Sequence, residues 1–112
     1  MKPKRIQRKR IKGWKMPPNT VYVGRPGKFG NPFSFQYWID AAGYSKMAAK
    51  QTVVDNFRYC LEKDSEPNND EGAKRMRIIK RDLHELGGKN LACWCRLDEP
   101  CHADVLLEFA NE

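Results

Sequence analysis

The chain has 112 residues and a formal net charge of +7, with 40% hydrophobic and 31% charged residues. This size fits one domain with one core, and no apolar run reaches the roughly 18 residues that a membrane span requires. No apolar stretch follows the basic N-terminus, so we expect no signal peptide and a cytoplasmic location. In that reducing compartment the four cysteines are expected as thiols or metal ligands rather than disulfides.

The positive charge is concentrated at the start of the chain. Residues 1–39 contain ten Lys and Arg and no acidic residue, whereas residues 40–112 carry a net charge of −3. This split favours an anionic partner for the N-terminal part, such as nucleic acid, a nucleotide phosphate or an acidic protein. A solvated basic face without a ligand would have the same composition, so charge leaves both interpretations open.

Residues 1–18 form a basic segment that we expect to be either an edge strand or a disordered arm. Two isoleucines favour a short strand over residues 5–11, whose long basic side chains would shield a sheet edge. A Pro-Pro pair at residues 17–18 ends the segment. Residues 20–23 are β-branched or aromatic and predict a buried strand, which a loop rich in Gly and Pro follows over residues 24–32.

Three helices are predicted in the middle of the chain. A short helix covers residues 34–42 and is closed by Gly43, and a longer one is capped by Ser45 and runs to about residue 63. A third helix is expected to be capped by Asp70 and to stop at the glycine pair that follows its last apolar residue. Its apolar residues recur every three or four positions: Met76, Ile79, Leu83 and Leu86.

The C-terminal part adds a second buried strand over residues 91–95 and a last helix over residues 101–110. Because helices separate the two buried strands in the sequence, these strands are expected to be parallel. The order of elements predicts a single compact α/β domain over residues 1–112, with a small, mainly parallel sheet and flanking helices.

The densest group of reactive side chains lies in the segment CWCRLDEPCH and consists of Cys93, Cys95, Cys101 and His102. Thiolates and imidazole are zinc ligands, although this spacing matches no common zinc-finger pattern. Alternatively, Cys101 at a helix start is a candidate nucleophile, with His102 as its base and Asp104 as an orienting group. A third interpretation is structural, because cysteines also pack well beneath a helix.

A second candidate segment is the glycine-rich loop VGRPGKFGNPF, residues 23–33. Its four candidate ligand-binding residues are Arg25, Lys28, Gly30 and Asn31, since cations meet phosphate, glycine allows close approach, and an amide can bind a base or sugar. The loop matches neither common phosphate-binding fingerprint, so ordinary turn chemistry is the alternative. Both segments follow strand ends, and parallel strands would bring them to one edge and form a pocket there.

Taken together, these motifs resemble the DUF4326 family, a domain of unknown function in small uncharacterised bacterial and phage proteins. The likeness covers nearly the whole chain and rests on RIQRKRIKGW, VYVGRPGKFGNPF, GKNLACWC and PCHADVL. It implies the cytoplasm of a bacterial or phage-infected cell and no particular activity. The functional candidates that it implies are Arg25, Lys28, Asn31, Cys93, Cys95, Cys101, His102 and Asp104.

The leading functional hypothesis is a small enzyme or sensor for a nucleotide or nucleobase-like ligand. In it the basic loop holds an anionic group, and Cys101 acts as nucleophile or metal ligand. The alternative is a non-enzymatic module, stabilised by zinc, that binds nucleic acid or an acidic protein through its basic N-terminal segment. An enclosed edge that joins Arg25, Asn31 and Cys101 would favour the first hypothesis, and a basic surface without a cleft would favour the second.

Overall fold

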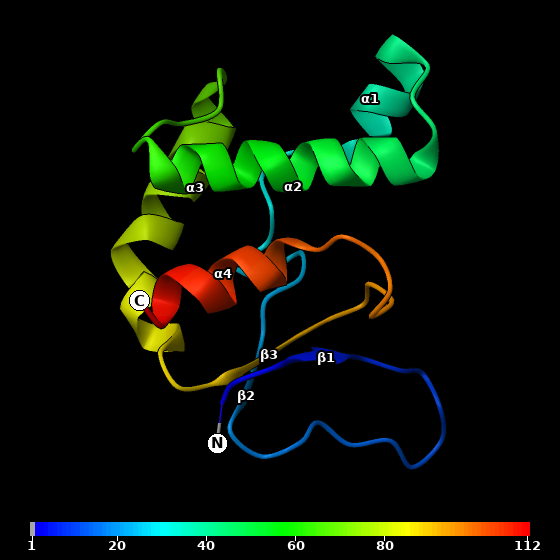
Figure 1. Ribbon diagram of the computed structural model, residues 1–112, viewed down its shortest axis with the longest axis vertical. Coiled ribbons are helices and arrows are strands. Elements are labelled where there is room, and N and C mark those ends of the chain that lie inside the picture. Colours follow the sequence, from blue (N-terminus) through cyan, green and yellow to red (C-terminus); the bar gives the residue numbers. More distant parts are fainter. Residues whose placement is uncertain (1) are drawn as a thin grey trace.

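The structure is a computed structural model and describes residues 2–112, which form a small sheet covered by helices (Figure 1). The elements in chain order are β1 (Arg5–Gln7), β2 (Thr20–Tyr22), α1 (Phe35–Ala42), α2 (Lys46–Glu62), α3 (Asp70–Asp82), the 3-10 helix η1 (Leu83–Leu86), β3 (Asn90–Cys93) and α4 (His102–Ala110). The predicted α/β class with a small parallel sheet is therefore confirmed. No helix within residues 2–112 combines the length and the apolar character needed to cross a membrane.

The last strand in the sequence, β3, is the central strand of the sheet. It pairs in parallel with β1 on one side and with β2 on the other, so that Leu91 lies between Arg5 and Val21. Three successive residues of β3, Leu91 to Cys93, are at most 2% exposed. A continuous buried run is typical of a parallel strand that is covered on both faces. The edge strand β1 is shorter than the predicted strand over residues 5–11.

The core lies between the sheet and α2, with α4 in the middle (Figure 1). Helix α4 contacts the strands β1 and β3, the 3-10 helix η1 and the long helix α2. The apolar stripes of the helices meet there, and the largest fully buried side chains include Phe57, Met76, Ile79, Leu86, Leu91, Val105 and Leu106. Because α4 begins where the loop after β3 ends, this packing also fixes the position of the CWCRLDEPCH segment.

The helix ends follow ordinary capping chemistry, with one correction to the sequence analysis. Ser45 caps α2 as predicted, since its Oγ accepts a hydrogen bond from the Ala48 N–H. The cap of α3 is Asn69 rather than Asp70, because Asn69 has the extended backbone of an N-cap and its Oδ1 accepts from the Gly72 N–H at 2.7 Å. Asp70 is the first helical residue, where its charge meets the positive end of the helix dipole.

The third predicted helix also changes type before its end. The segment Leu83–Leu86 is a 3-10 helix, η1, rather than a further turn of α3. The tighter winding still turns Leu86 into the core, where it is 1% exposed. Periodicity alone could not separate the two helix types, because the apolar spacing of three residues fits both.

Replacing Asn69 with alanine removes the side-chain acceptor of the Gly72 N–H and should lower the free energy of unfolding by about 1 kcal/mol. The matched control, Asp70→Ala, removes only an exposed charge near the helix dipole and should cost about 0.3 kcal/mol. Urea unfolding of both variants measures the difference. A larger loss for Asp70→Ala would contradict the assignment of the cap.

Candidate functional site: a thiol pocket

The two sequence motifs meet at the carboxyl ends of β2 and β3. The glycine-rich loop follows β2, and residues 94–101 lead from β3 to α4. Because these strands are parallel, both loops leave the sheet at the same edge. A pocket of about 400 Å³ lies there, lined by both loops and by α2. Arg25, Asn31 and Cys101 all line this pocket.

Three cysteine sulfurs lie together in the wall of this pocket. The Sγ atoms of Cys93, Cys95 and Cys101 are all within 4.8 Å of one another, and those of Cys93 and Cys101 are 2.9 Å apart. Cys93 ends β3 and Cys101 is the N-cap of α4, so the packing of α4 on β3 brings the sulfurs together. The fourth cysteine, Cys60, is buried in the core and does not belong to this group.

The contacts among the three thiols separate their pKa values. Hydrogen bonds from Cys93 and Cys95 lower the pKa of Cys101, and the hydrogen bond and charge of His102 act in the same direction. The hydrogen bond between Cys93 and Cys101 raises the pKa of Cys93. The hydrogen bond between Cys93 and Cys95 and the burial of Cys93 raise it further. Cys101 is therefore the sulfur that carries a negative charge first, because its two neighbours donate to it.

His102 is held by the backbone of the glycine-rich loop. Its Nε2 lies 2.8 Å from the Val23 carbonyl oxygen and 3.0 Å from that of Phe29, which assigns the proton to Nε2. Its Nδ1 faces Cys101 at 3.9 Å from Sγ, and its ring packs edge-on against Phe57. The expected proximity of His102 and Cys101 is present. The structure adds a second role, since His102 also joins α4 to the loop.

Arg5 lies beside the thiol cluster, and sequence reasoning missed it. Its side chain is 8% exposed, and its Nε is 3.4 Å from Asp104 Oδ1. Burial lowers the pKa of Arg5, but a hydrogen bond with Cys101 and the charge of Asp104 outweigh this effect and raise it. Its Nη2 donates to three carbonyl oxygens of the loop after β3, those of Arg96, Leu97 and Glu99.

Arg5 thus holds the loop of residues 96–99 in place and puts a positive charge next to Cys101. In the sequence it is one of many basic residues in the N-terminal segment. Only the pairing of Arg5 with Leu91 in the sheet brings it under the loop, and no local pattern indicates that register. Asp104 does not line the pocket and is half exposed, and its carboxylate pairs with Arg5.

Arg25 and Asn31 line the pocket, but their polar atoms form hydrogen bonds with the loop itself and with α2. Arg25 donates to the carbonyl oxygens of Asn31 and Phe33. The Asn31 amide donates to the Val53 carbonyl oxygen at 3.1 Å and accepts from the Phe33 N–H at 2.9 Å. Gly30 makes room for this arrangement, since a Cβ there would lie 2.9 Å from Arg25 Cγ. These residues shape the pocket wall.

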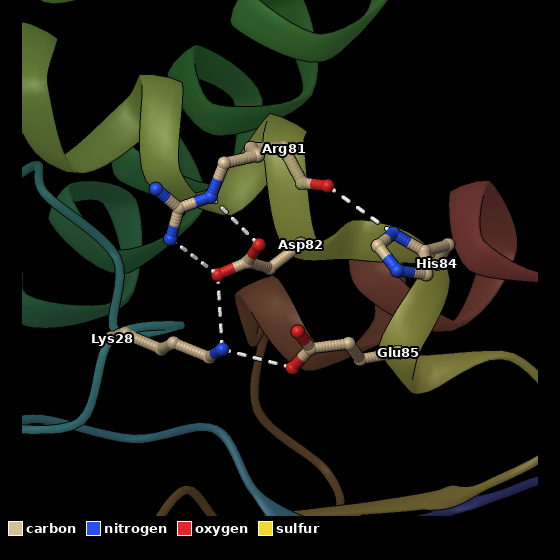
Figure 2. Close-up of polar contacts among 5 residues, drawn as sticks. All are labelled: Lys28, Arg81, Asp82, His84 and Glu85. Atoms are coloured by element: carbon tan, nitrogen blue, oxygen red, sulfur yellow. Dashed lines mark hydrogen bonds and ion pairs between the residues drawn. The ribbon is translucent and has the colours of Figure 1, made fainter.

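The structure does not bring Lys28 to the pocket. Figure 2 shows its Nζ between two carboxylates, 2.9 Å from Asp82 and 2.8 Å from Glu85. Asp82, whose side chain is 9% exposed, also accepts two hydrogen bonds from Arg81. The Arg81 hydrogen bonds, with that of Lys28, hold the pKa of Asp82 well below its usual range. Lys28 therefore ties the glycine-rich loop to the end of α3.

The pocket also contains residues that the motifs did not single out. Aromatic rings of Tyr22, Phe33, Phe35 and Trp94 line it. An ion pair between Lys50 and Glu99, with 2.6 Å between Nζ and Oε2, lies in the same wall and is mostly buried. The hydrogen bond from Lys50 lowers the pKa of Glu99. These residues come from four different segments of the sequence, so they lie close together only in the folded chain.

Two further arginines stack on the aromatic rings of the pocket. The guanidinium of Arg8 lies 4.6 Å from the centre of the Tyr22 ring and 4.7 Å from that of Trp94. Arg10 lies over Trp94 at the same distance of 4.7 Å. Trp94 is 40% exposed, so this stack borders the solvent. Part of the basic N-terminal segment is thereby placed next to the pocket.

Fold and site together define a small α/β domain with three clustered thiols in the wall of a pocket. The chain belongs to the DUF4326 family, a domain of unknown function, whose family model matches residues 6–112. This match confirms the resemblance seen in the motifs. Among curated proteins and among solved structures, none matches the chain.

Replacing His102 with alanine should cost about 2 kcal/mol of unfolding free energy, because the buried carbonyl groups of Val23 and Phe29 lose their donor. The control is His84→Ala, since His84 is exposed and its replacement should change stability by less than about 0.5 kcal/mol. Urea unfolding midpoints compare the two. Equal effects would show that His102 does not join α4 to the loop.

Replacing Asp82 with asparagine should lower Tm at neutral pH, and the difference from the unchanged protein should depend on pH. Since the pKa of Asp82 is lower in the folded chain, its contribution is complete above the unfolded value of about 3.9 and is lost as the pH falls below it. The difference in Tm between the unchanged protein and Asp82→Asn should thus be constant above about pH 5 and should become smaller below pH 4. Glu85→Gln, at an exposed pair, is the control with little effect.

Proposed function

We propose that this domain binds a nucleobase-containing ligand in the pocket at the carboxyl ends of β2 and β3. The observation that carries the proposal is the convergence of aromatic rings, a buried ion pair and a thiol cluster on one pocket. Its volume of about 400 Å³ lies in the range of small-molecule sites, which is roughly 300–1,000 Å³. A base or a nucleoside is of a size that such a pocket encloses.

The aromatic lining supports a flat ligand. Tyr22 and Trp94 border the pocket near the solvent, and Phe33 and Phe35 line it from the segment before and at the start of α1. Bases stack on such rings with a gain of roughly 1–3 kcal/mol each. The charged groups of Lys50 and Glu99 offer a donor and an acceptor to the edge of a base.

The anionic part of the ligand is assigned to Arg8 and Arg10. Arg25 and Lys28, which the sequence analysis favoured, are engaged with loop carbonyls and with carboxylates. Arg8 and Arg10 lie beside Trp94, and Arg8 Nε is buried with no hydrogen-bond partner among residues 2–112. A phosphate at this position would meet two guanidinium groups next to a stacked base.

The chemistry available to the bound ligand is that of the cluster around Cys101. Arg5 and His102 both favour its charged form, and a thiolate is at once a nucleophile and a metal ligand. In an enzymatic role, Cys101 would be at the reaction centre and His102 would hold it in position. Asp104 would contribute indirectly, by orienting Arg5. Two more thiols beside Cys101 favour metal ligation over attack by a single sulfur.

A second candidate function is binding of a nucleic acid strand. Residues 2–15 hold eight Lys and Arg, and several of them are exposed beside the Arg8 and Trp94 stack. A strand could follow this segment while one base enters the pocket. The length of the ligand distinguishes the two functions: a strand gains affinity over a mononucleotide and loses it steeply with salt.

Calorimetric titration of the reduced protein with nucleosides, nucleoside monophosphates and short oligonucleotides tests both functions. We expect one saturable site, with affinity reduced about tenfold or more in Trp94→Ala, because a stacking partner is lost. The matched control is Trp38→Ala, since Trp38 stacks on Tyr44 and does not line the pocket. Arg10→Ala should remove the preference for monophosphate over nucleoside.

Absence of saturable binding for every one of these ligands would overturn the proposal. Equal losses in Trp94→Ala and Trp38→Ala would place the binding outside the pocket. Binding of oligonucleotides alone, with a steep dependence on salt, would leave the second function in place of the first.

A further inference from the structure

We propose that Cys93, Cys95 and Cys101 ligate one thiophilic divalent cation of the zinc class and leave its fourth coordination position open to the pocket. This proposal concerns metal binding by the three cysteines, and it does not depend on whether the pocket binds a nucleobase. It rests on the placement of three sulfurs, on a buried positive charge beside them and on their position in the lining of the pocket.

The placement of the sulfurs fits one shared cation. Two sulfurs that each lie about 2.3 Å from a tetrahedral zinc are about 3.8 Å apart. The three Sγ atoms lie within 4.8 Å of one another. Cys93 and Cys101 are closer than the ideal, at 2.9 Å, and they need to separate by about 1 Å.

A disulfide between Cys93 and Cys101 is the competing product of the same contact. It would require the two sulfurs to approach by about 0.9 Å, to the usual length of about 2.05 Å. It would also leave Cys95 without a role and would leave no negative charge in the cluster. Both consequences conflict with the surroundings of the cluster, as the position of Arg5 indicates.

Arg5 is the independent observation that points to a negatively charged cluster. Its side chain is 8% exposed, and its Nη1 has no hydrogen-bond partner in the part of the chain that the structure describes, residues 2–112. A buried guanidinium is costly unless an anion lies beside it. Asp104, its carboxylate partner, is 55% exposed, so it is largely screened by water.

A divalent cation with three thiolates carries a net charge of −1 and would neutralise Arg5. Three neutral thiols or a disulfide carry no charge and would leave the guanidinium with Asp104 as its only anionic neighbour. A single Cys101 thiolate would supply the same charge of −1 as the cation cluster, so the charge of Arg5 excludes the neutral states, and the placement of three sulfurs around one point favours the cation over the lone thiolate.

The fourth position of the cation is assigned to the pocket rather than to His102. Cys93, Cys95 and Cys101 all line the pocket, so an ion among them faces it. The ring nitrogens of His102 do not belong to the group of atoms within 4.8 Å of one another, and its Nε2 is held by two carbonyl oxygens. Three protein ligands with an open position are typical of catalytic zinc sites, whereas structural sites are closed.

The test uses cobalt as a spectroscopic probe for zinc. Reduced, full-length protein is stripped with a chelator and titrated with Co²⁺ while the sulfur-to-cobalt charge-transfer absorption is recorded. We expect saturation at about one cobalt per chain and displacement by zinc. Cys93→Ser, Cys95→Ser and Cys101→Ser should each weaken binding at least about 100-fold, since each removes a ligand rather than a supporting contact.

Two variants provide the controls. Cys60→Ser removes a buried cysteine outside the cluster and should leave cobalt binding unchanged. His102→Gln should keep the stoichiometry and the charge-transfer intensity, because His102 is not a ligand in this proposal. Loss of cobalt binding in His102→Gln would overturn the open fourth position.

A measurement on the unchanged protein covers the case in which the serine variants fail to fold. Zinc should protect the three clustered cysteines from alkylation, while the labelling of Cys60 stays the same, as peptide mass mapping reports. No charge-transfer absorption in folded, reduced protein would overturn the proposal. Equal labelling with and without zinc would overturn it too, as would a Cys93–Cys101 disulfide that persists with reductant.

Discussion

The parallel pairing of β3 with both β1 and β2 is the constraint on which the rest of the structure depends. It brings the glycine-rich loop and the loop after β3 to one edge, and it places Arg5 beneath the second loop. Helix α4 then packs on β3 and returns Cys101 to Cys93. The pocket, the thiol cluster and its buried counter-charge all follow from this one arrangement of three short strands.

Much of the fold and part of the site could be predicted, because local patterns determine them. Buried strands are continuous apolar runs and helices carry apolar stripes, so the elements and the shared edge of the two loops followed from the sequence. The roles of single charged residues did not. Lys28 and Arg5 meet partners 54 and more than 90 positions away, and no local signal indicates such distant pairs.

The excess of positive charge in the N-terminal part of the chain serves two purposes in the structure. Part of the N-terminal excess is used inside the protein, since Arg5 holds a loop, Arg25 folds back on its own loop and Lys28 pairs with two carboxylates. The other seven Lys and Arg of residues 1–39 all lie in residues 2–15, and two of them, Arg8 and Arg10, stack on Trp94. The excess therefore identifies a smaller basic surface than the composition implies, and one that borders the pocket.

The position of β3 in the sequence also determines when the sheet can form. Lys4 and Asn90 are joined across 86 positions, and neither β1 nor β2 has another strand to pair with in residues 2–112. During synthesis both therefore wait as unpaired strands until Asn90–Cys93 have left the ribosome, while the helices between β2 and β3 can form earlier. The thiols of Cys93 and Cys101 lie at the end of this strand and at the start of α4, so their cluster likewise has to wait for β3.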